Sequence, residues 1–173
     1  MAEKVLLLLG IADAEEAGIY IKKESHRRDV RVKGEGRQHE ENAVEEAFNY
    51  ARSKSKSVVA VQVLYSDLYH YGHTDLLLPG PGKKRFLLYV RDEVLKQAMG
   101  REKALRERAR RQGIALEVRS VESQDPASTA VEEAKKGYDA IFLPKERKRR
   151  FPLLKRNVEQ QLRKQVLTPI ISC

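Results

Sequence analysis

Short segments rich in Val, Ile and Leu recur along the chain, and the segments between them carry apolar residues at helical spacing. Residues 4–9, 58–64 and 140–143 are almost entirely apolar, as in strands buried on both faces of a sheet. Residues 115–121 alternate between apolar and polar, which is typical of a strand with one solvated face. With a short last strand at 168–173, the sequence predicts five strands.

Helices are predicted where apolar residues fall three or four positions apart, because this spacing places them on one face of a helix. One helix is expected from Asn42 to near Ser53, and a longer one from about Arg85 to Gln112. A third begins at Asp125–Pro126, an N-cap followed by proline in the first turn, and stops at Gly137. The fourth has apolar residues at steps of four, at Leu154, Val158 and Leu162.

Strands and helices therefore alternate from one end of the chain to the other. This order predicts an α/β fold: a doubly wound, five-stranded parallel sheet with helices on both faces, as in Rossmann-like proteins. We expect a single domain over residues 1–173, with an inserted arm at about 18–41 and a long loop at about 66–84. Two Pro-Gly pairs within 79–82 disfavour regular structure in that loop.

The net charge is positive and concentrated near the C-terminus. The 173 residues carry a formal charge of +9, and residues 145–164 contain nine Lys or Arg against two Glu. A basic patch attracts phosphate-bearing ligands, nucleic acid and anionic lipid. The charge therefore favours an anionic partner but does not distinguish among these three classes.

Several classes of protein are excluded by the composition. Cys173 is the only cysteine, so an internal disulfide framework is impossible. No apolar run approaches the ~18 residues that a membrane span needs. The first nine residues are too short and too acidic for a signal peptide. We expect a cytoplasmic protein that does not bind a membrane.

The order and spacing of these segments resemble the universal stress protein family. The most specific likeness is the ending, in which YDAIFLP (138–144) is followed by a helix and then by TPII (168–171). The resemblance implies the strand order 3-2-1-4-5 and a nucleotide cleft beside the first and fourth strands. It also implies a homodimer, which we expect to form through the C-terminal strand Thr168–Cys173, because an open sheet edge can pair with another copy.

The family's ATP-binding members carry a glycine motif, G-x2-G-x9-G followed by Ser or Thr, after the fourth strand, where bare backbone approaches the phosphates. Here Pro144 and Arg147 occupy the first two glycine positions, and Arg156–Asn157 stand where the Gly-Ser pair belongs. The resemblance leaves four nucleotide-cleft candidates by position, which are Gly10, Asp13, Val63 and Val158. The sequence predicts that the backbone cradle for ATP is altered or lost.

A basic loop directly after the strand 140–143 is the leading candidate site, because ligands of doubly wound sheets bind beyond the carboxyl ends of the strands. Arginine forks onto phosphate or carboxylate, and the N-terminus of the following helix adds positive charge. The anion-binding candidates are Lys145, Arg147, Lys148, Arg149, Arg150 and Asn157. A solvated surface loop or a protein-binding loop would look the same. Nucleic acid is not favoured, because only Phe151 and Tyr138 are near enough in sequence to stack on bases.

A second candidate site follows the second strand. Residues 67–73 contain D-x2-H-x-G-H, which is similar to a signature of adenylyl-transferring enzymes, in which His70 and His73 would stabilise charge on ATP phosphates. In those enzymes the motif follows the first strand, and a second signature near the last strands is missing here. We therefore keep catalysis by His70 and His73 as an alternative only. Asp67 and Asp75 add metal-ligand types to this loop, but without a second ligand cluster we predict no metal site.

The function expected from these observations is that of a non-enzymatic regulatory or stress-response module. Its expected ligand is an adenine nucleotide or a phosphate-like anion, with a protein partner as the alternative. The two alternatives are an adenylyl-transferring enzyme and a nucleic-acid-binding protein that uses residues 145–164.

Overall fold

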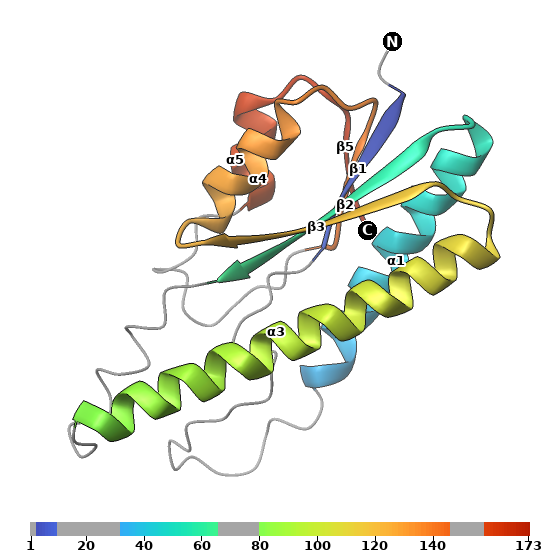
Figure 1. Ribbon diagram of the computed structural model, residues 1–173. Coiled ribbons are helices and arrows are strands. Elements are labelled where there is room, and N and C mark those ends of the chain that lie inside the picture. The colour runs from blue at the N-terminus through green and yellow to red at the C-terminus, as the bar shows by residue number, and fades with distance from the viewer. Residues whose placement is uncertain (1–2, 10–31, 66–79, 146–157) are drawn as a thin grey trace.

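A computed structural model describes residues 3–9, 32–65, 80–145 and 158–173. Its strands form one five-stranded sheet in the order β3-β2-β1-β4-β5 (Figure 1). They are β1 (Lys4–Leu8), β2 (Ser57–Tyr65), β3 (Leu116–Ser123), β4 (Ile141–Leu143) and β5 (Ile170–Ser172). Every pair of neighbours is parallel. The predicted fold class and strand order are confirmed.

The helices form a layer on each side of this sheet. Helices α1 (Val32–Ser53) and α3 (Gly80–Arg111) lie on one face, and α4 (Pro126–Ala134) and α5 (Val158–Gln165) lie on the other (Figure 1). β1 is central, so its consecutive residues serve both layers: Val5 and Leu7 pack beneath α1, whereas Leu6 and Leu8 pack beneath α4 and α5. Burial on both sides explains why this strand is a continuous apolar run.

The helix termini follow the local signals predicted from the sequence. The Asp125 side chain accepts a hydrogen bond from the Ser128 backbone N–H at 3.3 Å, as an N-cap residue does. Gly113 follows α3 with a φ of 67°, and the Ile114 N–H bonds back to the Ala109 carbonyl at 2.9 Å. Gly137 has a φ of 85° shortly after α4. These positive φ angles suit glycine because an L side chain would be strained there.

The predicted boundaries of the arm and the long loop are wrong at their C-terminal ends. α1 begins at Val32 rather than Asn42, so residues 32–41 are helical. This segment is rich in Glu, Gln, Lys and Arg, which are good helix formers but leave no apolar periodicity to detect. α3 begins at Gly80 rather than near Arg85. Pro81 lies in the first turn, where proline needs no N–H partner, so this Pro-Gly segment starts the helix. Residues 10–31 and 66–79 lie outside the described part of the chain.

Helix α3 is much longer than the strands that it covers. Arg91 forms an ion pair of 3.1 Å with Glu122, the next-to-last residue of β3. The residues of α3 before Arg91 therefore extend beyond the carboxyl end of the sheet, by about 16 Å at 1.5 Å per residue (Figure 1). No helix in the described residues is long and apolar enough to cross a membrane.

A buried glutamine joins α3 to the sheet. Gln62 is 0% exposed, and its Nε2 donates to the Ala98 carbonyl at 3.2 Å and to the Ser120 Oγ at 2.8 Å. Its Oε1 has no hydrogen-bond partner among the described residues. A buried, unsatisfied amide oxygen lowers stability, because it has lost its hydrogen bonds to water.

We predict that packing, and not hydrogen bonding, is the main stabilising contribution of Gln62. Gln62→Met keeps the side-chain length and removes the unsatisfied oxygen, so its free energy of unfolding should stay within about 1 kcal/mol of the wild type or rise. Gln62→Ala leaves a cavity and should lower this free energy by about 2–3 kcal/mol. Urea unfolding followed by circular dichroism measures both variants. A loss for Gln62→Met as large as that for Gln62→Ala would contradict the prediction.

Candidate ligand site at the carboxyl end of the sheet

β1 and β4 lie side by side, and the chain leaves them in opposite directions. Leu6 pairs with Ile141, and Leu7 pairs with Phe142. From β1 the chain crosses to β2 through α1, whereas β4 continues to β5 through α5 on the other face (Figure 1). The two crossovers diverge, so the carboxyl ends of β1 and β4 mark the topological switch point of the sheet. Ligands of open α/β sheets bind at this position.

The described residues at this switch point include two buried leucines and one exposed lysine. The Leu9 N–H bonds to the Val61 carbonyl at 2.9 Å, and Leu9 and Leu143 are both buried. The Lys145 N–H bonds to the Cys173 carbonyl at 2.7 Å, which fixes the backbone just past β4. The Lys145 side chain is exposed. A cationic group therefore lies at the rim of the switch point on a fixed piece of backbone.

Two other cleft candidates lie on one face of the sheet. Val63 is buried on β2, two residues after Val61 and four after Val59, so it shares their face beneath α4 and α5. Val158, the first residue of α5, packs against the core of that same face. Both side chains are thus part of the apolar layer beneath α4 and α5. They therefore lie on the face of the sheet that is covered by α5, the helix that follows β4.

The remaining predicted site residues lie outside the described part of the chain. They are Gly10, Asp13, His70, His73, Arg147, Lys148, Arg149, Arg150 and Asn157. Within the described residues, no group of three or more His, Cys, Asp or Glu side chains could hold a metal ion.

The overhanging start of α3 carries positive charge past the carboxyl end of the sheet, on the side of β2 and β3. Lys84 and Arg85 are both exposed, and they lie on the part of α3 that extends past the carboxyl end of the sheet. Their position depends on the length of α3 and its alignment with β3. No local signal in the sequence shows this alignment.

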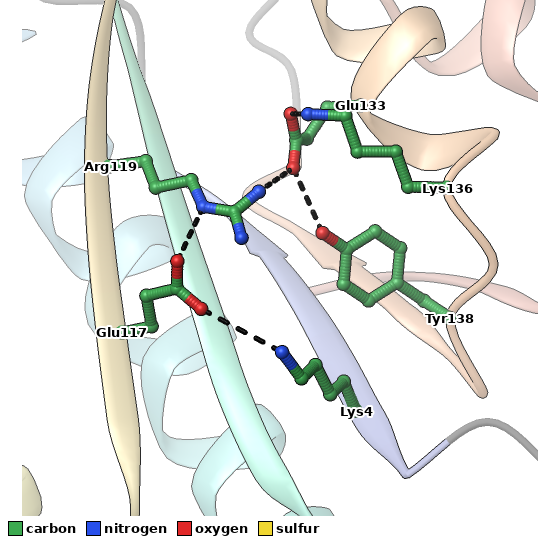
Figure 2. A network of polar contacts seen from close by, with 6 residues as sticks. All are labelled: Lys4, Glu117, Arg119, Glu133, Lys136 and Tyr138. Carbon is green, nitrogen blue, oxygen red and sulfur yellow. Dashed lines mark hydrogen bonds and ion pairs between the residues drawn. The ribbon is translucent and has the colours of Figure 1, made fainter.

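A network of charged side chains lies near the opposite, amino end of the sheet (Figure 2). Glu133 on α4 is buried, and its carboxylate accepts hydrogen bonds from Arg119 at 2.7 Å, from the Tyr138 hydroxyl at 2.9 Å and from Lys136. Arg119 also binds Glu117 at 2.7 Å, and Glu117 lies 3.8 Å from the Lys4 ammonium. Figure 2 shows Arg119 between the two carboxylates, so it links the edge strand β3 to α4.

The electrostatics of this network favour a structural role. Burial opposes ionisation of Glu133, but the bonds from Lys136 and Tyr138 and the charge of Arg119 outweigh it, so the pKa of Glu133 is lowered from its ordinary value of 4.5. Burial and the hydrogen bond to Glu133 raise the pKa of Tyr138 to about 12. Both shifts favour the protonation states that these contacts require, which are an ionised Glu133 and a protonated Tyr138. The network thus ties α4 to β3 at the amino end of the sheet.

A second group of polar contacts lies at the amino end of the sheet, on the face covered by α1. The Tyr50 hydroxyl of α1 donates to Asp139 at 2.6 Å, and Lys56 lies 2.9 Å from the same carboxylate. The hydrogen bond from Tyr50, followed by the bond and charge of Lys56, lowers the pKa of Asp139. Burial, with a smaller contribution from Glu46, raises the pKa of the Cys173 thiol, which does not make it a reactive thiolate. Sequence reasoning missed both charged clusters, because their members are far apart in the chain.

We predict that Glu133 makes folding stability depend on pH in the acid range. The lowered pKa means that the unfolded chain takes up protons first, so stability is full above about pH 4.5 and falls as the pH decreases through the folded value. Glu133→Gln should lower the free energy of unfolding at pH 7 by about 2–3 kcal/mol and make the acid dependence shallower.

The matched control is Glu132→Gln, the same change at the adjacent exposed position. It should leave the unfolding free energy within about 0.5 kcal/mol of the wild type. Urea unfolding at intervals between pH 7 and pH 3 measures all three proteins. Equal acid slopes for the wild type and Glu133→Gln would show that this carboxylate is not linked to folding.

Comparison of the sequence with protein-family models and with curated proteins identifies no relative. No protein-family model matches the chain, and no curated protein matches it significantly.

Comparison of structures gives a consistent set of similar folds. A protein of the universal stress protein family from Burkholderia pseudomallei has a TM-score of 0.57 and 17% identity, and the match covers 99% of this chain and 95% of that one. The universal stress protein UspA from Lactobacillus plantarum has a TM-score of 0.55 and 16% identity, with 99% and 98% covered. A universal stress protein family protein from Arabidopsis thaliana, solved with AMP bound, has a TM-score of 0.50 and 11% identity, with 98% and 89% covered. The chain therefore has the fold of universal stress proteins along nearly its whole length.

Proposed function

We propose that this protein is a non-enzymatic regulatory module of the universal stress protein type. It would bind an adenine nucleotide or a related phosphate-bearing anion at the carboxyl ends of β1 and β4. The observation that carries this proposal is the pairing of β1 with β4 at the point where the two crossovers diverge. That arrangement is the ligand-binding position of doubly wound sheets. The AMP bound to the Arabidopsis protein of the same fold supports the choice of ligand class.

The proposed mode of binding uses cationic side chains in place of bare backbone. Pro144 and Arg147 occupy the positions where the family's ATP-binding members have glycine, so a close backbone cradle for a triphosphate is altered or lost. Lys145 is exposed at the rim of the switch point, and the next residues in sequence include Arg147 and Arg149. Long cationic side chains at an exposed site must be ordered to hold a phosphate, and their attraction to it is screened by salt. We therefore expect modest affinity and a marked dependence on salt.

The basic segment, residues 145–150, should make a measurable contribution to the affinity for phosphate-bearing anions. Isothermal titration of ATP, AMP and inorganic polyphosphate should give dissociation constants that rise roughly 3- to 10-fold when Lys145, Arg147 or Arg149 is changed to Ala, because each change removes a phosphate contact. Lys103→Ala is the matched control, since Lys103 is an exposed lysine on α3 far from the switch point in sequence. Unchanged affinity in all three variants would remove the basic segment from the site. Tighter, steeply salt-dependent binding of RNA or DNA would favour a nucleic-acid partner instead.

The module should leave ATP chemically intact. Neither ionisable cluster of the described residues is placed to transfer a proton near neutral pH, so no turnover is expected from them. Incubation with radiolabelled ATP, followed by separation of AMP, ADP and pyrophosphate, tests this. Product release that disappears in His73→Ala would instead establish the adenylyl-transfer alternative.

Self-association remains a prediction of this proposal. The sequence placed the dimer contact at Thr168–Cys173, which contains β5. No described strand pairs with the outer edge of β5, so this edge can accept another strand. It offers only three strand residues, Ile170–Ser172, and a contact of that length is weak by itself.

A further inference from the structure

The other edge of the sheet is longer and has a more specific arrangement of side chains. β3 spans the eight residues Leu116–Ser123 and is the outermost strand beyond β2 (Figure 1). In a parallel pair, alternate residues direct their backbone groups to the neighbouring strand. The Ala115 carbonyl accepts a hydrogen bond from the Val58 N–H, so odd-numbered residues of β3 face β2. The N–H and C=O groups of the even-numbered residues, Leu116, Val118, Ser120 and Glu122, therefore point out of the sheet.

We propose that a second copy of this chain docks on this edge, with the two β3 strands antiparallel about a two-fold axis at Val118. The outward backbone groups of each copy would meet those of the other, in roughly six hydrogen bonds over residues 116–120. The two sheets would then form one continuous sheet across the interface.

Charge complementarity selects this register. With the axis at Val118, Glu117 of one copy lies opposite Arg119 of the other, and the same pair repeats on the far side of the axis. Both side chains lie on the same face, where they already bind each other within one chain at 2.7 Å. Cross-strand neighbours of opposite charge attract, and like charges repel. An axis at Glu117 or at Arg119 would place like charges opposite each other, and an axis at Ser120 would leave both charges facing uncharged residues.

Helix α3 fits the same arrangement. Its residues Leu88 and Leu95 flank Arg91 at helical spacing, and Arg91 bonds to Glu122 of β3, so this side of α3 faces the β3 edge. Met99, one turn after Leu95, is 71% exposed, and Leu88 is 49% exposed. Gln62 bonds to the Ala98 carbonyl and pairs with Ser120, so Met99 lies at the level of Ser120, two residues from the proposed axis.

The distance expected between the two α3 helices is also compatible with this dimer. α3 contacts both β2 and β3 through Gln62 and Glu122, so its axis lies over the gap between these strands. With strands about 4.8 Å apart, the two α3 helices would lie about 10 Å apart across the two-fold axis. This is an ordinary separation for packed helices, so Met99 of each copy would be covered without a clash between backbones.

The alternative reading is that Glu117 and Arg119 protect the edge from pairing. Charged side chains commonly blunt the exposed edges of sheets. The two readings predict different solution behaviour, because a protected edge leaves the chain monomeric or paired through β5.

Amide hydrogen exchange at low and high protein concentration distinguishes the edges directly. Docking at β3 should slow exchange of the outward amides of Leu116, Val118 and Ser120 by at least roughly tenfold at high concentration. The amides of Glu117 and Arg119 are already bonded to β2 and should change little. Protection that rises with concentration at Ile170 and Ser172, with none at β3, would place the contact at β5 and overturn the proposal. Unchanged exchange at both edges would overturn it as well.

Two variants test the interface by sedimentation velocity. Val118→Pro removes an outward N–H and leaves the bonds between β3 and β2 in place, which an edge strand tolerates, so it should abolish the dimer with little loss of fold. Glu117→Lys places like charges opposite each other and should raise the dimer dissociation constant by roughly tenfold. Glu132→Lys makes the same charge change at an exposed position of α4, away from the β3 edge, so it should leave dimerisation within about twofold. Equal effects of Glu117→Lys and Glu132→Lys would rule out the proposed charge pairing across the axis.

Discussion

The parallel pairing of β1 with β4 is the contact on which the rest of the structure depends. These two segments are more than 130 residues apart in the chain, and Leu6 pairs with Ile141 at the centre of the sheet. The pairing joins the half formed by β1, β2 and β3 to the half formed by β4 and β5. It also makes β1 interior on every side, which is why all of its residues after Lys4 are buried and apolar. The same contact creates the switch point, so the stability of the sheet and the position at which doubly wound sheets bind ligands have one structural origin.

The two ends of the sheet are chemically different. At the amino end, buried or partly buried carboxylates are matched by Arg119, Tyr138, Tyr50 and Lys56, and these contacts fix α1 and α4 to the strands. Their pKa values move away from neutrality, as expected for groups held in one charge state. At the carboxyl end, the described cations are exposed, and Lys145 is held only through its backbone. The two ends therefore differ in whether their charged side chains are paired within the chain or left to solvent.

Much of the fold could be predicted from the sequence because its signals are local. The strand at 58–64 and the helix start at Asp125–Pro126 depend on neighbouring residues alone, and both are confirmed. The start of α1 was placed too late, because the polar residues at 32–41 form a helix without an apolar stripe. The candidate site was only partly predictable: Lys145 was found from its position after a strand. The overhang that carries Lys84 and Arg85 past the carboxyl end of β3 depends instead on how α3 packs on the sheet.

By itself, the sequence determined the type and order of the described elements, the ends of several helices, and the concentration of positive charge after the fourth strand. These properties depend on hydrophobic period, capping residues and composition, which act over a few residues. Only the tertiary structure decided which charges are neutralised. Arg119 meets Glu133, and Tyr50 meets Asp139, across distances in the chain that no periodicity encodes. It also decided that Ala98 of α3 lies over the pair Gln62–Ser120 of the sheet, because the register of strands and the overhang of a helix are set by packing between distant segments.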